Sequence, residues 1–149
     1  MVSTIPAAEG RSLVFLDVAD GTDREIFARD CPYQSVSHLA CCPTGEWLLA
    51  VAEMSLVVWS MRDLAQQPRI IRNDNRKHFT GIAFHPSGRY LAATSNDATV
   101  KLYDTATWEV ARTFTWEIGR MRSIAFSPDG TLAAAGSDTG KVVVWDVDV

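Results

Sequence analysis

The chain has 149 residues, of which 47% are hydrophobic and 21% charged, and its formal net charge is −4. This composition is typical of one soluble globular domain, and it excludes a largely disordered chain and a general attraction for nucleic acid or anionic membranes. No apolar run approaches the roughly eighteen residues of a membrane span, and the start of the chain does not resemble a signal peptide, so we expect neither membrane nor nucleic acid as a partner and predict a cytoplasmic location.

The first predicted elements are two strands joined by a tight turn. SLVFLDV begins at Ser12, REIFARD begins at Arg24, and the Asp20-Gly21 pair between them favours a hairpin turn. The preceding STIPAA is a weaker strand candidate, because Pro6 has no N–H to donate to a sheet.

The cysteines come next along the chain, at Cys31, Cys41 and Cys42. Three cysteines cannot all pair within one chain, and the adjacent Cys41 and Cys42 would close a strained ring if they paired with each other. We therefore expect reduced thiols, with alternate side chains facing the core.

Three segments of similar sequence then follow one another. They are VSHLACCPTGEWLLAVAEMSLVVWS from Val36, FTGIAFHPSGRYLAATSNDATVKLYD from Phe79 and MRSIAFSPDGTLAAAGSDTGKVVVWD from Met121. Their turn prolines are 43 and 42 residues apart and their closing aromatic residues 44 and 42 apart, so two independent markers keep nearly the same period. The positions that repeat in this way are Pro43, Pro86 and Pro128, and Trp59, Tyr103 and Trp145.

This period predicts propeller blades. Repeats of about 40 to 45 residues with four short strands each are typical of propellers, whereas helical repeats do not place Pro-x-Gly after a strand. In each unit the proline presets one turn dihedral and the glycine completes the turn before the next β-rich run. The period also extends backwards, since Leu16 lies 43 residues before Trp59, so the strands at the start read as the third and fourth of an earlier unit.

These segments resemble the WD-repeat β-propeller family, whose repeats follow the pattern V..VAFSPDG..LA.GS.D.TV.LWD. The resemblance covers most of the chain and implies an all-β fold, a partial ring of about 3.5 four-stranded antiparallel blades. We predict a single partial propeller over 1–149, with an incomplete blade at 1–31, blades at 32–72 and 73–115, and a blade lacking its outer strand at 116–149.

The sequence departs from the family at a buried hydrogen-bond network. The family joins a Gly-His dipeptide to an Asp of the second turn, a Ser or Thr and the closing Trp, but no Gly-His occurs at the matching places here. Asp97 alone sits well in the turn-Asp position, since Asp138 is one place off and Glu53 stands there in the first unit. We therefore expect the blades to be held mainly by apolar packing, with Trp59, Tyr103 and Trp145 as large fillers.

About three and a half blades do not close a ring, since propellers need at least four and this family usually has about seven. Uncovered blade faces would leave a large apolar surface in water. Two arrangements would cover them. Either a second copy completes the ring as a homo-oligomer, or the chain is part of a longer propeller.

Candidate binding residues lie in the loops that the resemblance places on one face of the propeller. Arg76 and Lys77, with His78 beside them, belong to the one basic cluster, which could hold a carboxylate or phosphate or could simply be a solvated loop. Trp116, next to two arginines, could bind a partner or pack over a blade edge. The protein-binding candidates are Tyr33, Arg76, Lys77, His78, Asn96, Trp116, Arg120 and Arg122.

No motif of catalysis, metal binding or phosphate binding stands out. His38 and Cys42 could share a strand face as a Cys-His pair, but the repeat gives Cys42 the turn-entry position of His85 and Ser127, so a structural role is preferred. We expect no metal and no cofactor. The sequence favours a non-catalytic scaffold that binds protein or peptide, and the alternative is a subunit or fragment of a propeller enzyme acting on a small substrate at the central channel.

Overall fold

A computed structural model of the chain describes residues 2–7, 10–17, 24–30, 35–63 and 65–148, with side chains described from residue 35 onward. Every element in these ranges is a β-strand, and none is a helix that could cross a membrane. The chain forms two compact units, Met1–Ser35 and Val36–Val149. The predicted all-β fold of short antiparallel strands is confirmed.

The first unit is a three-stranded antiparallel sheet with the order β1-β2-β3. Its strands are β1 (Val2–Ala7), β2 (Gly10–Asp17) and β3 (Arg24–Asp30). Both predicted strands are confirmed, and β3 coincides with REIFARD. The weaker candidate is also a strand, because Pro6 lies in the edge strand β1, where a missing N–H is tolerated. The predicted turn at Asp20-Gly21 lies outside the described residues.

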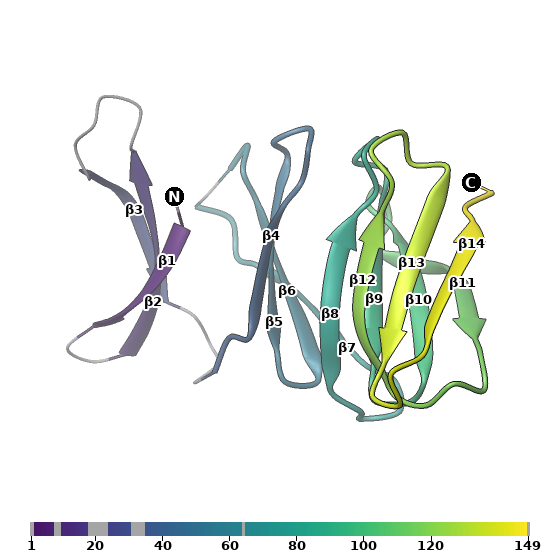
Figure 1. The fold of residues 1–149 in the computed structure, drawn as a ribbon. Helices are drawn as coiled ribbons and strands as arrows, with labels where there is room; N and C mark the ends of the chain where they lie inside the picture. Colours follow the sequence, from purple (N-terminus) through teal and green to yellow (C-terminus); the bar gives the residue numbers. More distant parts are fainter. Residues whose placement is uncertain (1, 8–9, 18–23, 31–34, 64, 149) are drawn as a thin grey trace. The chain divides into compact units, whose positions relative to one another are not determined.

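The second unit contains three sheets, each an antiparallel meander in which consecutive strands pair (Figure 1). The first has the strands β4 (His38–Cys41), β5 (Trp47–Ala52), β6 (Ser55–Ser60) and β7 (Arg69–Arg72). The second has β8 (Phe79–Phe84), β9 (Tyr90–Ser95), β10 (Thr99–Asp104) and β11 (Glu109–Thr115). The third has β12 (Met121–Phe126), β13 (Leu132–Ser137) and β14 (Val142–Asp146). The first strands of the sheets are neighbours, since β8 contacts both β4 and β12.

The predicted Pro-x-Gly turns have the same geometry in all three sheets. In each, the glycine N–H donates to the carbonyl of the residue before proline, at 2.9, 2.8 and 2.9 Å for Gly45, Gly88 and Gly130. The three glycines have φ angles of 75°, 73° and 76°. Proline in the second position and glycine in the last are the residues that such a turn prefers, which is why the motif recurs with the period of the repeat.

Apolar side chains join the first sheet to the second. Leu49 and Val51 of β5, with Leu56 and Val58 of β6, pack against Leu91 and other residues of the β8–β11 sheet. Trp47 and Trp108 meet edge to face across this contact, with ring centroids 5.4 Å apart. The filler predicted for the second repeat, Tyr103, is part of this core and is 2% exposed.

The second sheet packs against the third with its other face. Ala92, Val100 and Leu102 contact Met121 and Ala135, and Trp145 lies against the same cluster. The opposite face of the third sheet is open within the described residues. On it Val142 and Val144 are 68% and 60% exposed, whereas their repeat counterparts Val100 and Leu102 are covered.

A second repeated contact joins neighbouring sheets at the Pro-x-Gly turns. At two of the three turns, the residue before the proline donates to the carbonyl of the turn glycine in the next sheet: Cys42 Sγ donates to Gly88 O at 3.7 Å, and His85 Nε2 donates to Gly130 O at 3.0 Å. The Ser87 N–H donates to His85 Nδ1 at 3.1 Å, so the other ring nitrogen carries the proton. Cys42 is therefore a buried link between sheets, while Cys41 is exposed, and both are free thiols as expected.

This contact predicts different effects of alanine at two turn glycines with nearly equal φ. A Cβ on Gly130 would lie 2.4 Å from His85 Nε2, whereas no described atom lies within 4 Å of a Cβ on Gly45. We expect Gly45→Ala to lower the free energy of unfolding by about 1 kcal/mol through backbone strain alone. Gly130→Ala should lose about 1–2 kcal/mol more, because the His85 ring must leave its hydrogen bond. Urea unfolding of both variants measures the difference, and equal losses would show that the His85 contact adds nothing.

Candidate protein-binding site

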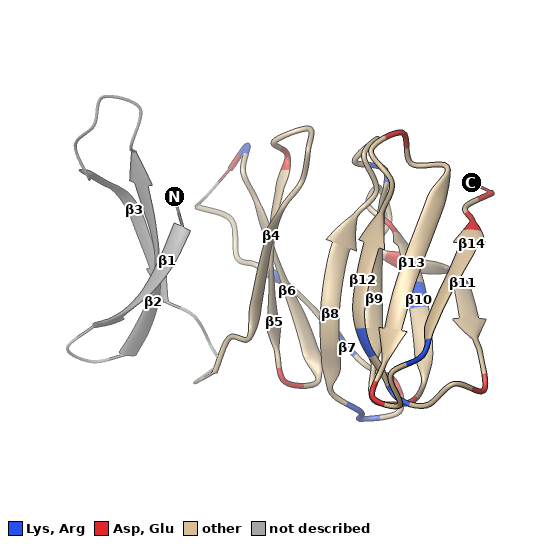
Figure 2. Cartoon of the chain, viewed as in Figure 1, with Lys and Arg blue, Asp and Glu red and all other residues tan. Residues whose placement is uncertain are grey.

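The described loops that contain candidate binding residues lie at one end of the sheets of the second unit. Backbone hydrogen bonds tie them to one another. Asn73 N donates to Met54 O at 2.8 Å and Asn96 N to His78 O at 3.0 Å, and Asp138 N donates to Arg120 O at 2.9 Å. We call this end the loop face, and it comprises residues 53–54, 73–78, 96–98, 117–122 and 138–140. Figure 2 marks Lys and Arg in blue on the β7–β8 loop, at the lower end of the view.

The β7–β8 loop is held by the side chain of Asn73, which is only 4% exposed. Its Nδ2 donates to Lys77 O and to Ser95 Oγ, both at 2.9 Å. The Arg76 N–H donates to Asn73 O at 3.1 Å, and Arg76 adopts a left-handed backbone with φ 57°. This internal bonding fixes the loop backbone and leaves the side chains of Arg76, Lys77 and His78 exposed.

Lys101 lies behind this loop with its ammonium group buried, and the residue is 6% exposed. Its Nζ donates to Asn73 Oδ1 at 2.8 Å and to the carboxylate of Asp74. In the repeat Lys101 takes the place of Val57 and Val143, so a charged residue stands where the other units have an apolar one. Burial of an ammonium is tolerated here because an amide oxygen and a carboxylate satisfy it.

The carboxylates beside the loop are therefore already engaged. Hydrogen bonding and charge attraction from Lys101 hold the pKa of Asp74 below its usual range. Burial raises the pKa of Asp97, but hydrogen bonds from Thr99 and Asn75 outweigh it and leave that pKa below the ordinary value. Burial first, and then the charges of Asp74 and Asp97, raise the pKa of Tyr103.

This network occupies the region where the family has its Gly-His dipeptide. Asn75 Nδ2 donates to the carboxylate of Asp97, and Asn73 Nδ2 donates to Ser95 Oγ, so asparagines take part in a polar network at the place where the family has its histidine. The indole N–H groups of Trp59 and Trp145 find no partner among the described residues. Sequence reasoning missed Asn73 and Lys101, and the signal that could have found Lys101 was a lysine inside an otherwise apolar strand position of the repeat.

Arg122 joins the second and third sheets on the loop face. Its Nη1 donates to Asn96 Oδ1 at 3.0 Å, and its Nη2 lies 3.7 Å from Asp138 Oδ2. Arg120 N donates to Asp138 Oδ1 at 3.0 Å, while the Arg120 side chain forms no ion pair within the described ranges. Six of the predicted residues are thus gathered on the loop face: Arg76, Lys77, His78, Asn96, Arg120 and Arg122.

The two aromatic candidates stand apart from this group. The Trp116 ring stacks on Phe114, with centroids 5.7 Å apart and an interplanar angle of 3°, and lies 4.6 Å from the Trp145 ring. Trp116 is half-buried in that cluster, which corresponds to the packing alternative considered for it. Tyr33 lies outside the described residues.

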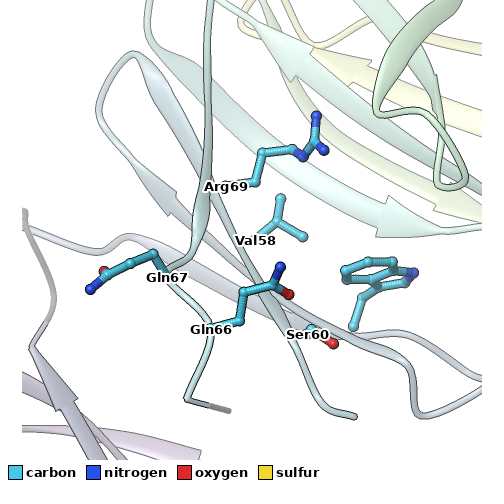
Figure 3. A pocket seen from close by; sticks show the side chains of 6 residues that line it. Val58, Ser60, Gln66, Gln67 and Arg69 are labelled. Atoms are coloured by element: carbon cyan, nitrogen blue, oxygen red, sulfur yellow. The ribbon is translucent and has the colours of Figure 1, made fainter. Parts of the chain in front are cut away.

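A pocket of about 230 Å³ lies at the outer strand β7, apart from the loop face (Figure 3). Arg69, Gln66 and Gln67 contribute polar groups to its wall, and Trp47, Val58 and Ser60 complete the lining. This lining contains a hydroxyl but no imidazole or carboxylate to act as its base, so it offers hydrogen bonds and apolar contact to a ligand. No group of three or more His, Cys, Asp or Glu in the described part of the chain is placed to hold a metal ion.

The Lys101 network predicts a pH-dependent loss of stability in Lys101→Met. Methionine keeps the length of the side chain but leaves Asn73 Oδ1 without its buried donor, so we expect a loss of about 1–2 kcal/mol in the free energy of unfolding near neutral pH. Lys77→Met, at an exposed position, is the matched control and should change stability by less than about 0.5 kcal/mol.

The pH dependence follows from the lowered pKa of Asp74. Its contribution to stability is present above the unfolded value of 3.8 and is lost as the pH falls through the lower folded pKa. The gap between the wild type and Lys101→Met should therefore narrow between about pH 6 and about pH 3, as measured by urea unfolding. A gap that stays constant over this range would contradict the ion pair.

Comparison with known proteins agrees with this architecture. The family model described as WD domain, G-beta repeat matches residues 70–104 and 108–146. The chain is 23% identical over 132 residues to the uncharacterized WD repeat-containing protein sll1491 of Synechocystis, an alignment covering 88% of this chain and 37% of that protein.

Two eukaryotic proteins are similar to the chain over a comparable share. The target of rapamycin complex subunit wat1 of Schizosaccharomyces pombe is 25% identical, over 75% of this chain and 35% of its own length. The serine-threonine kinase receptor-associated protein of Gallus gallus is 28% identical, over 77% of this chain and 32% of its own length. The chain thus spans about a third of the length of these relatives. With its repeated four-stranded sheets and Pro-x-Gly turns, the chain belongs to the WD-repeat family.

Proposed function

We propose that the chain is part of a non-catalytic scaffold that binds a protein or peptide through the loop face. The observation that carries this proposal is the set of exposed Arg76, Lys77 and Arg120 side chains on loops whose backbones are fixed by hydrogen bonds. Loops that are already ordered lose little conformational entropy when a partner binds, so a few charged contacts contribute more of their energy to affinity.

The relatives support a role in protein assemblies. One is named as a subunit of a target of rapamycin complex and another as a protein associated with a serine-threonine kinase receptor. WD-repeat proteins are in general non-catalytic scaffolds, so the family also favours binding over catalysis. The cytoplasmic location stays a prediction.

We further propose that another blade covers the open face of the β12–β14 sheet. The equivalent face of the β8–β11 sheet is buried by its neighbour, whereas Val142 and Val144 remain exposed. Apolar side chains at these positions are stabilised when a further sheet removes them from water. The covering blade comes from a second copy or from the rest of a longer propeller, which would complete a ring of about seven blades.

Binding through the loop face predicts that charge reversal there removes partners. In a pull-down from native lysate, Arg76→Glu/Arg120→Glu should lose most of the proteins that the wild type captures, because the new glutamates would repel the groups that the arginines bind. Arg89→Glu/Arg112→Glu changes the charge by the same amount at exposed positions away from the loop face and should keep those proteins. An unchanged set of partners in the first variant would refute the loop face as the binding site.

If a second copy covers the open face of the β12–β14 sheet, the protein should be an oligomer in solution. We expect light scattering to give a multiple of the 16.4 kDa chain mass, and Val144→Asp to shift the protein to the monomer, because a charge would be buried at the contact. Val110→Asp, at a 46% exposed position of β11, should leave the mass unchanged. A folded wild-type monomer would contradict assembly of copies and would leave a longer propeller as the source of the covering blade.

A further inference from the structure

We propose that the loop face recognises an acidic segment of its partner, whose carboxylates or phosphates contact Arg76 and Lys77. This inference rests on the proposed function and adds the chemical class of the ligand. It comes from the way in which the buried Lys101 changes the electrostatics of the β7–β8 loop.

The first step is the commitment of Asp74 to Lys101. Asp74 is the acidic residue within the loop itself, and its carboxylate accepts from the Lys101 ammonium. Lys101 is buried, so it cannot reach a ligand, but it cancels the charge that would otherwise oppose Arg76 and Lys77. An opposite charge in direct contact removes most of the field of a carboxylate at the distance of a neighbouring side chain.

The second step concerns Asp97, the nearest carboxylate of the adjacent turn. Its oxygens accept from the Thr99 N–H at 2.9 Å, from the Thr99 hydroxyl and from Asn75 Nδ2. These donors hold the carboxylate in place. Neither Arg76 nor Lys77 forms an ion pair with any described residue, so both cations remain available to a ligand.

The third step is the fixed backbone at Arg76. A left-handed conformation costs a residue with a side chain about 1–2 kcal/mol, yet Arg76 adopts it with φ 57°. The bonds of Asn73 to Arg76 N and Lys77 O hold it there. The two cationic side chains thus leave an ordered turn, where a guanidinium can form paired hydrogen bonds to one anionic group and an ammonium can bind a second as a point charge.

The remaining charges of the loop face favour a short acidic segment over nucleic acid. Glu53 and Glu117 are exposed in neighbouring loops, and Asp138 is exposed beside Arg122. A polymer with a charge on every residue would meet these carboxylates, whereas a peptide with one or two anionic groups can place them at Arg76 and Lys77 alone. The net charge of −4 also opposes a polyanion.

The test uses a short capped peptide with two adjacent glutamates among glycine and serine, titrated into ¹⁵N-labelled protein and followed by NMR. We expect chemical-shift changes at the amides of residues 73–78. The glutamate peptide should bind about tenfold more tightly than the matched peptide with two glutamines. Arg76→Glu/Lys77→Glu should abolish the binding, and Arg89→Glu/Arg112→Glu should retain it. Equal binding of the two peptides, or loss in both variants, overturns the proposal.

A rescue experiment tests the role of Lys101 separately. Lys101→Met frees the Asp74 carboxylate, so it should weaken binding of the glutamate peptide roughly threefold to tenfold even though Lys101 cannot touch the peptide. Adding Asp74→Asn should restore the affinity, because the freed charge is then gone. If the double variant stays weak, the loop has lost its shape rather than its charge balance, and the electrostatic argument is wrong.

Two further probes identify the source of the anionic group. A peptide with phosphoserines in place of the glutamates should bind to the same amides, and tighter binding than the glutamate peptide would assign a phosphorylated segment. Tighter binding of a short oligothymidylate than of either peptide would overturn the assignment to a peptide.

The outcomes also separate this inference from the proposed function. If Arg76→Glu/Arg120→Glu loses its partners in the pull-down while the two peptides bind equally, the loop face binds protein but not through acidic groups. If that variant keeps its partners, the proposed function itself fails.

Discussion

The structure of the second unit depends on central strands that are apolar on both faces. In β9, Leu91 and Ala93 pack toward one neighbouring sheet while Ala92 packs toward the other. Such a strand cannot face water on either side, so each sheet must lie between two others. The same constraint explains why the β12–β14 sheet, with one neighbour described, leaves Val142 and Val144 exposed.

Stacking of antiparallel meanders sends the connections to two opposite ends of the sheets, and the two ends have different chemistry. At one end the Pro-x-Gly turns link neighbouring sheets through Cys42 and His85, and these contacts are local and repeated. At the other end lies the loop face, whose turns and loops carry most of the candidate binding residues. The proposed binding at the loop face would therefore be separated from the repeated contacts that join the sheets, so that the loops could vary without disturbing the packed core.

The polar network around Lys101 connects the core to the loop face. A buried ammonium needs full satisfaction, and it obtains this from Asn73 and Asp74, both of which belong to the β7–β8 loop. One interaction therefore fixes the position of the loop and alters its charge. The histidine network of the family is not reproduced at this place. Instead, a network of asparagine, lysine and aspartate joins the β7–β8 loop to the neighbouring strands.

The sequence by itself determined the repeat, the strand order and the turns, because hydrophobic alternation and Pro-x-Gly chemistry act over a few residues and recur with a constant period. Through its resemblance to the WD-repeat family, the sequence also indicated which loops share one face, and the meander of each sheet places them at the same end. It did not determine that Trp116 packs against Phe114 and Trp145, or that Lys101 binds Asp74. Those contacts join residues far apart along the chain, and whether a side chain meets a partner or water depends on how the sheets stack, so only the tertiary structure decided them.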